Sequence, residues 1–378
     1  MKIPNAFRLD PSADGLMDQI AAVPASSGIY VLVVRGRPTH MSWTANLRRR
    51  LARLLNPAPI AGKGLLESLR NTLAAVECWA TGSRLETSLL MYELGKTYFP
   101  DDYLKRLRLR MPWFVGLTSQ DLFPRLTVVN RLPRKAGALF GPFSSRDSAQ
   151  RYGDEVLGLF QIRRCTENLN PHPEHPGCIY GEMNQCLRPC QCAVTPEEYG
   201  SESARVAEFL ASNGKSLVTV LASARDRASV ETDFEQAALI HKRIEKATAA
   251  AGARDGAVAE VHEFNGVALT RATETGSLRF WPMLAGHWQT PITLSFSGEE
   301  RSAKSLDQEL REGFADSERN RDAGGNRIEE LAIFARWYYS SWRDGEWFPF
   351  HSIADLNYRR LVREISKMMK ADVANATG

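Results

Sequence analysis

The chain has 378 residues, of which 43% are hydrophobic and 24% charged, with a formal net charge of +4. This composition excludes an extensively disordered protein, and the length allows two or three domains. The first twenty residues lack a secretory apolar core, and no run approaches 18 consecutive apolar residues. We therefore expect a cytoplasmic protein without membrane contact. The small positive charge permits a nucleic-acid partner without requiring one.

Hydrophobic periodicity predicts a small domain of strands and helices at the start of the chain. Short apolar runs rich in β-branched residues indicate strands, and leucines spaced by three or four indicate helices. The expected elements are a strand at 28–34, its hairpin partner at 39–43, a helix at 46–56, and helical or mixed segments at 64–80 and 84–99.

Positive charge is concentrated in the first half of the chain, with aromatic residues between the basic ones. Arginine and lysine beside aromatic side chains suit a surface that neutralises phosphates and stacks bases. The alternative is a set of solvated helix faces. The candidate DNA-binding residues are Arg48, Arg49, Arg53, Lys105, Arg106, Arg125, Arg134 and Lys135.

One short segment holds most of the cysteines: Cys178, Cys186, Cys190 and Cys192 lie within residues 177–192, and Cys165 precedes them. In a reducing compartment, clustered thiols bind metal more often than they form disulfides. Four thiolates can hold a zinc ion or an iron–sulfur cluster, and the wide spacing favours a cluster. A disulfide or buried free thiols are the remaining alternatives.

Two helical runs follow at 195–212 and 216–250, and we expect them to form a helical hairpin. Residues 251–257 have the composition of a linker. Beyond it, strand and helix patterns alternate, which predicts a separate C-terminal α+β domain with no function that its sequence identifies.

In this order the motifs resemble the UvrC family of excinucleases and its Cho-like relatives, over about residues 25–250. The resemblance rests on GIY at 28–30 with ANLRRRL at 45–51, FPR at 123–125 with FGPF at 140–143, the cysteine segment, and FEQAALIHKRI at 234–244. It implies a 4Fe–4S cluster, with zinc as the alternative, on Cys165, Cys178, Cys186 and Cys190.

The resemblance also implies an α+β fold and a division of the chain into functional segments. The fold would combine a small GIY-YIG-like mixed sheet with helices, a cysteine segment, a UVR-type helical hairpin and a small C-terminal α+β domain. The expected segments are an extension at 1–24, a degenerate GIY-YIG nuclease-like domain at 25–103, a basic connection at 104–164, the cysteine segment at 165–200, the UVR-like hairpin at 201–250 and the C-terminal domain at 251–378. The second nuclease domain and paired helix–hairpin–helix units of full-length UvrC are not expected here.

The hairpin resembles the motif through which UvrC-like proteins meet UvrB. Its partner-binding positions would be Phe234, Ala237, Ala238 and Ile244. Where the family usually has Arg-Asp, this chain has His241 and Lys242, which alters the polar half of such a contact. An intramolecular hairpin without a partner is the alternative.

The nuclease centre departs from the family pattern. Tyr30 matches the first tyrosine and Arg50 the phosphate-binding arginine, but His40 stands in place of the second tyrosine and Met91 in place of the metal-binding glutamate. A thioether is a poor ligand for Mg²⁺ or Mn²⁺, which prefer oxygen. Glu93 is two residues away, about 200° around the helix axis, and could replace the glutamate only if the helix were shifted or kinked. His40 could act as the base, or it is a polar residue left in a retired site.

Three hypotheses follow. The first is a DNA-binding repair protein that docks a UvrB-type partner and whose nuclease centre has decayed. The second is an active metal-dependent endonuclease that makes one incision in nucleotide excision repair. The third is an iron–sulfur adaptor without direct DNA contact, which salt-dependent DNA binding would distinguish from the other two.

Overall fold

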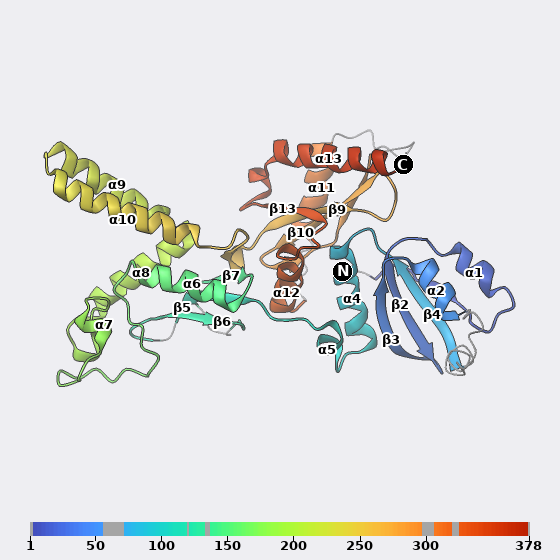
Figure 1. The fold of residues 1–378 in the computed structure, drawn as a ribbon, viewed down its shortest axis with the longest axis horizontal. Coiled ribbons are helices and arrows are strands. Elements are labelled where there is room, and N and C mark those ends of the chain that lie inside the picture. The colour runs from blue at the N-terminus through green and yellow to red at the C-terminus, as the bar shows by residue number, and fades with distance from the viewer. Residues whose placement is uncertain are drawn as a thin grey trace. The chain divides into compact units, whose positions relative to one another are not determined.

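The computed structural model describes residues 3–55, 72–118, 121–132, 137–296, 306–319 and 325–376. The chain forms two compact units: Met1–Arg110 together with Asn265–Gly378, and Met111–Phe264. We call them unit 1 and unit 2. Both combine helices with small antiparallel sheets, so the expected α+β class is confirmed (Figure 1). The six expected segments stay a prediction.

Unit 1 begins with a four-stranded sheet in the order β1-β4-β2-β3. The strands are β1 (Phe7–Leu9), β2 (Gly28–Val34), β3 (Arg37–Thr44) and β4 (Leu73–Ala80). β2 turns into β3 through Arg35 and Gly36, both at positive φ, and this two-residue turn makes an antiparallel hairpin. All pairings in this sheet are antiparallel, which corrects the expected mixed sheet.

Side chains of β2 alternate between the two faces of this sheet. Tyr30 and Leu32 pack with α1 (Leu16–Ala22) and α2 (Leu47–Leu55). Ile29, Val31 and Val33 pack on the opposite face with Leu90 and Leu94 of α4 (Arg84–Tyr98). Figure 1 shows α4 on one side of the sheet and α1 and α2 on the other.

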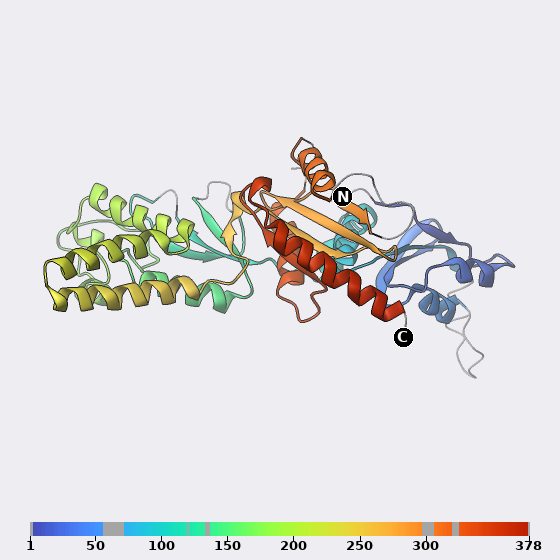
Figure 2. The same cartoon turned by 90° about the horizontal axis from the view of Figure 1, so that it is seen from above.

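The second part of unit 1 is a five-stranded sheet in which β11-β10-β9-β13 are neighbours and β12 pairs with β10. Its strands are β9 (Gly266–Arg271), β10 (Ser277–Leu284), β11 (His287–Trp288), β12 (Ile292–Ser295) and β13 (Gly345–Pro349), and its helices are α11 (Leu306–Arg319), α12 (Arg327–Tyr338) and α13 (Tyr358–Ala376). Leu361 and Ile365 of α13 join the sheet core, and Figure 2 shows the helix lying across the strands.

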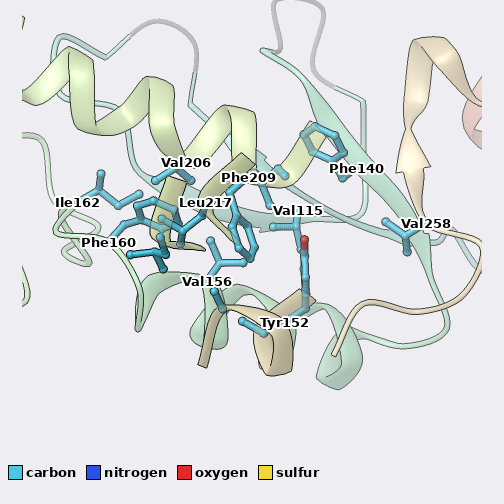
Figure 3. Packing of buried hydrophobic residues seen from close by; sticks show 14 of the residues in the cluster. Val115, Phe140, Tyr152, Val156, Phe160, Ile162, Val206, Phe209, Leu217 and Val258 are labelled. Atoms are coloured by element: carbon cyan, nitrogen blue, oxygen red, sulfur yellow. The ribbon is translucent and has the colours of Figure 1, made fainter. Parts of the chain in front are cut away.

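Unit 2 is built on the sheet β6-β5-β7-β8. Its elements are β5 (Trp113–Leu117), β6 (Leu126–Val129), β7 (Leu139–Phe143), β8 (Ala259–Glu260), α6 (Arg146–Leu157), α7 (Ile179–Glu182), α8 (Pro196–Ser212), α9 (Lys215–Val230) and α10 (Phe234–Gly252). One core joins the sheet to α6, α8, α9 and α10: Val115 and Phe140 lie with Tyr152 of α6 and Phe209 of α8 (Figure 3).

The helical hairpin of unit 2 consists of α9 and α10, which run side by side in Figures 1 and 2. It forms inside the run that the sequence predicts as one helix. Thr232 has a φ of 60°, outside the helical region, and the Asp233 side chain accepts from the Gln236 N–H at 3.0 Å and caps α10. In the described residues, no helix is long and apolar enough to cross a membrane.

Candidate functional site

The fold brings three of the predicted catalytic side chains together. Tyr30, on β2, is buried, and its hydroxyl accepts a hydrogen bond from Arg50 Nε of α2 at 3.2 Å. The ring centroids of Tyr30 and His40 are 6.1 Å apart across the β2–β3 pair. The sequence motif therefore corresponds to one cluster in space.

His40 lies in a cationic environment. Its partial burial lowers the pKa of the imidazole, and the charges of Arg106 and Arg50 lower this pKa further. The neutral ring is the proton-accepting form, so this environment keeps His40 able to act as a base.

The metal position differs from what cation binding requires. Met91 faces a cavity that His40 also lines, whereas Glu93 of the same helix pairs with Lys96 at 3.7 Å and is absent from the described lining of that cavity. Glu86 is buried and accepts from the Gly82 N–H at 2.8 Å while it pairs with Arg279 of β10. The described lining thus offers a thioether but no Asp or Glu oxygen to a hard cation.

The cysteine segment lies in unit 2, after α6. Cys186 and Cys190 are buried, Cys165 is half-buried, and Cys178 and Cys192 are exposed. Burial raises the pKa of Cys186, and the neighbouring Cys165, Cys178 and Cys190 raise it further, as expected for thiols close enough to repel one another when ionised. The same four predicted ligands are therefore neighbours.

The chemistry of these four residues fits a bound metal group. The donor set is the soft thiolate set that iron–sulfur clusters use, and the Arg188 N–H points to Cys186 Sγ at 3.4 Å, the kind of hydrogen bond that tunes such clusters. Among the described residues, no three His, Cys, Asp or Glu side chains converge closely enough to hold a metal as they stand. Binding would therefore need the thiols to draw together.

Arg163 fastens this segment to the rest of unit 2. Its buried guanidinium donates to the carbonyls of Phe123 and Glu167 at 2.8 Å each and pairs with Asp121 at 3.1 Å. Its own N–H donates to the hydroxyl of Tyr199 in α8 at 2.8 Å. Cys165 is thus held close to the β5–β6 connection.

A basic groove of about 440 Å³ lies beside the cysteine segment, between β6 and α6. Arg125, Arg146 and Arg164 line it together with Tyr180, and the Arg164 guanidinium lies 5.3 Å from the centroid of the Tyr180 ring. Asp154 is the one acidic residue in its described lining. Arg125 was a sequence candidate, but Arg146 was not, because it is an isolated basic residue in the sequence and only the fold places it here.

Five of the other predicted DNA-binding residues lie in unit 1. Arg48, Arg49 and Arg53 are exposed on α2, and Lys105 and Arg106 are exposed on α5 (Tyr103–Leu107). Arg48 Nε donates to the Val23 carbonyl at 2.8 Å. Arg134 and Lys135 lie outside the described residues.

The hairpin exposes apolar side chains around its turn. Phe234 is 68% exposed and Val230 is 84% exposed, and Ala238 is also exposed. Ala237 and Ile244 instead pack against the unit 2 core. Of the four predicted partner-binding residues, two therefore lie on an exposed face of the hairpin and two on the face that packs inside unit 2.

Comparison with known proteins bears on these sites. Residues 112–210 match the family described as UvrC/Cho excinuclease, middle domain. The resemblance to the UvrC family is confirmed. This UvrC-like stretch includes β5–β7, α6, the basic groove and all four predicted cluster cysteines, whereas Tyr30, His40 and Met91 lie outside it.

The chain is also similar to several curated proteins named UvrABC system protein C. The matches include those of Oleidesulfovibrio alaskensis, 27% identical over 68% of this chain and 37% of the relative; Sphingopyxis alaskensis, 28% identical over 64% and 37%; and Anaeromyxobacter sp., 32% identical over 59% and 31%. The aligned part thus spans about a third of the length of these UvrC relatives. No solved structure matches the chain.

Proposed function

We propose that this UvrC-like chain is a DNA-repair protein of the nucleotide excision pathway that binds DNA through the basic groove of unit 2. The observation that carries the proposal is the groove itself. Three guanidiniums and an aromatic ring meet on the part of the chain that matches the UvrC/Cho family, next to the cysteine segment. Guanidiniums neutralise phosphates, and an aromatic ring can stack on an unpaired base.

Fluorescence anisotropy with a labelled duplex carrying a bulky adduct tests this proposal. Arg125→Gln, Arg146→Gln and Arg164→Gln should each weaken binding and reduce the salt slope by about one. Arg227→Gln, on α9, is the matched control and should behave as the wild type. Binding that is absent, or independent of salt, would favour the adaptor hypothesis instead.

We infer that the nuclease centre has decayed. Tyr30, His40 and Arg50 still cluster, but Met91 occupies the metal position and the described cavity lining holds no carboxylate. A phosphodiester hydrolase needs a base and charge stabilisation, and a metal-dependent one also needs oxygen ligands. The second candidate function is an active endonuclease with a rearranged centre. The observation in its support is His40, whose lowered pKa favours a neutral imidazole beside Arg50.

Nicking of an adduct-bearing duplex, with Mg²⁺ or Mn²⁺ and with or without a UvrB-type protein, separates the two. We expect no incision by the wild type. Incision that Arg50→Ala abolishes would instead establish an active centre. Met91→Glu tests whether the missing ligand alone restores cleavage.

We propose further that Cys165, Cys178, Cys186 and Cys190 bind a 4Fe–4S cluster, with zinc as the alternative. Bound there, such a group would cross-link the segment between α6 and α8. Anaerobic purification followed by iron, sulfide and zinc analysis tests this. Cys186→Ser should lose the metal, whereas Cys192→Ser, a cysteine in the same segment, should keep it. Retention of metal in Cys186→Ser would contradict the assignment.

We also propose that the exposed face of the hairpin docks a UvrB-type partner. Exposed apolar side chains at the turn, Val230 and Phe234, suit a protein interface. Co-elution with a UvrB-type protein should be lost in Phe234→Ala and kept in Val220→Ala, an exposed apolar control on α9. Equal co-elution of both variants would contradict this docking face.

A further inference from the structure

The cavity of unit 1 that His40 and Met91 line has a volume of about 650 Å³, and the DNA-binding proposal for unit 2 does not involve it. We call it the arginine cavity. It is lined by β3, the first half of α4, the residues at the end of α5, and α12 with Trp342. This volume is in the range of small-ligand sites, which run from about 300 to 1,000 Å³.

The charge of the cavity is one-sided. Four guanidiniums, those of Arg84, Arg106, Arg108 and Arg336, line it, and its described lining contains no Asp or Glu. Asp102, outside the lining, pairs with Arg106 at 2.7 Å and offsets one of these charges. The remaining positive potential favours an anion over a metal cation.

Two of these arginines are held in place by the protein. The Arg84 guanidinium lies 3.9 Å from the centroid of the Trp43 ring. Arg336 Nη1 donates to the Leu107 carbonyl at 2.8 Å. An arginine that is already ordered loses less side-chain entropy when it binds a phosphate.

The cavity also presents aromatic and apolar surface. Trp43 is 42% exposed and Trp342 is 38% exposed, and both line the cavity together with Met91 and Ile333. Indole rings offer faces on which a planar base can stack. Arg84 covers one face of the Trp43 ring, so the partly exposed ring of Trp342 is the principal stacking surface. Clustered guanidiniums beside such a ring match a ligand that joins a phosphate to a flat base.

We propose that the arginine cavity binds a nucleoside monophosphate unit, with its phosphate among the guanidiniums and its base against the indoles. The unit can be a free nucleotide or the 5′-phosphorylated end of a single strand, since both present the same chemistry. The proposal does not require the basic groove of unit 2 to bind DNA. It makes Met91 an apolar wall residue of a binding site.

Isothermal titration calorimetry of the full chain with dAMP tests the proposal, with deoxyadenosine and inorganic phosphate as the partial ligands. dAMP should bind, and each partial ligand should bind at least about tenfold more weakly, since each leaves part of the cavity unpaired. Absence of dAMP binding, or equal binding of dAMP and deoxyadenosine, overturns the proposal.

Variants assign the binding to this cavity. Arg336→Gln and Trp342→Ala should each weaken dAMP binding about tenfold. Met91→Glu should also weaken it, because the added carboxylate carries the same negative charge as the phosphate of dAMP. Because Arg336 also supports the Leu107 carbonyl, Arg108→Gln repeats the test without that contact. Arg359→Gln, an exposed arginine on α13, is the control. Folded Arg336→Gln and Arg108→Gln proteins that bind dAMP as the wild type does would overturn the assignment.

An oligothymidylate with and without a 5′ phosphate distinguishes the two sources. Tighter binding of the phosphorylated strand than of dAMP supports a strand end, and weaker binding supports a free nucleotide. Equal binding of the two strands, both tighter than dAMP and both insensitive to Arg108→Gln, overturns the proposal. Arg125 lines the groove of unit 2 and not the arginine cavity, so Arg125→Gln should leave dAMP binding unchanged. Failure of the DNA-binding proposal would therefore not alter the dAMP results.

Discussion

At the scale of single residues, the surroundings of His40 change the pKa of its imidazole. Burial, Arg106 and Arg50 all lower its pKa below the ordinary value of 6.5. The fold therefore favours the neutral imidazole, and protonation of His40 opposes folding. The stability contributed by His40 is fully present above pH 6.5 and is lost as the pH falls from there through the folded-state pKa.

We expect an NMR titration of the imidazole resonances to give His40 a pKa below 6.5. Arg106→Gln should raise this pKa, because it removes one of the two cations, and added salt should do the same by screening. Arg53→Gln, on the same helix as Arg50, is the control and should leave the titration unchanged. A His40 pKa at or above 6.5 in the wild type would contradict this description of its surroundings.

Glu86 is a second residue whose environment determines its role. Burial raises the pKa of its carboxyl group, and the pairing with Arg279 and the hydrogen bond from Gly82 oppose that rise without cancelling it. The side chains of Glu86 and Arg279 are 6% and 17% exposed, so the pair is largely shielded from water.

Removal of one partner should leave a buried uncompensated charge. We expect Arg279→Met to destabilise the protein by about 3 kcal/mol in urea unfolding, and the double variant Glu86→Gln with Arg279→Met to recover part of that loss. Arg360→Met, an exposed arginine of α13, should cost less than about 1 kcal/mol. A double variant no more stable than Arg279→Met alone would show that the unpaired Glu86 charge is not the cause of the destabilisation.

At the scale of elements, the cysteine segment depends on anchoring as well as on its thiols. Arg163→Met should remove the donors to the Phe123 and Glu167 carbonyls and destabilise unit 2 by about 2–3 kcal/mol, because buried acceptors lose charged partners. Chemical denaturation followed by tryptophan fluorescence measures this.

Arg205→Met provides the comparison for Arg163. The Arg205 side chain is 52% exposed and pairs with Glu202 of the same helix, so its loss should cost about 1 kcal/mol or less. If the Arg205 and Arg163 variants were equally destabilised, the anchoring role of Arg163 would be refuted.

The elements that local pattern predicts well are those with one clear period. The strand at 28–34, its hairpin partner and the helix from Leu47 are all present. Residues 73–80 form β4, although their alanines suit a helix equally well, because pairing with β2 and β1 decides their conformation. The break between α9 and α10 depends on a positive φ at Thr232, which the amino-acid composition of the segment does not predict.

The same limit applies to the sites. The cluster of Tyr30, His40 and Arg50 follows from a contiguous motif. The arginine cavity does not, because Arg84 and Arg336 come from helices more than two hundred residues apart. Only tertiary packing brings such residues together.

At the scale of the whole molecule, the first compact unit joins both ends of the chain. The hydroxyls of Tyr92 and Tyr103 donate to the buried Glu329 of α12 at 2.7 and 2.9 Å. Burial and the Glu329 charge raise the pKa of Tyr103 to about 12 and also raise that of Tyr92, so both stay hydrogen-bond donors at neutral pH. α4 and α12 are therefore linked by polar contacts that neither end of the chain can form alone.

Two units with separate cores should unfold in two calorimetric transitions. Glu329→Leu leaves the buried Tyr92 hydroxyl and the partly buried Tyr103 hydroxyl without their acceptor. The loss of about 2 kcal/mol should lower the transition of unit 1 by roughly 4–8 °C. Arg163→Met should lower only the transition of unit 2. A single transition that both variants shift equally would mean that the two units fold as one cooperative body, and the arginine cavity and the basic groove would then share their stability rather than depend on separate cores.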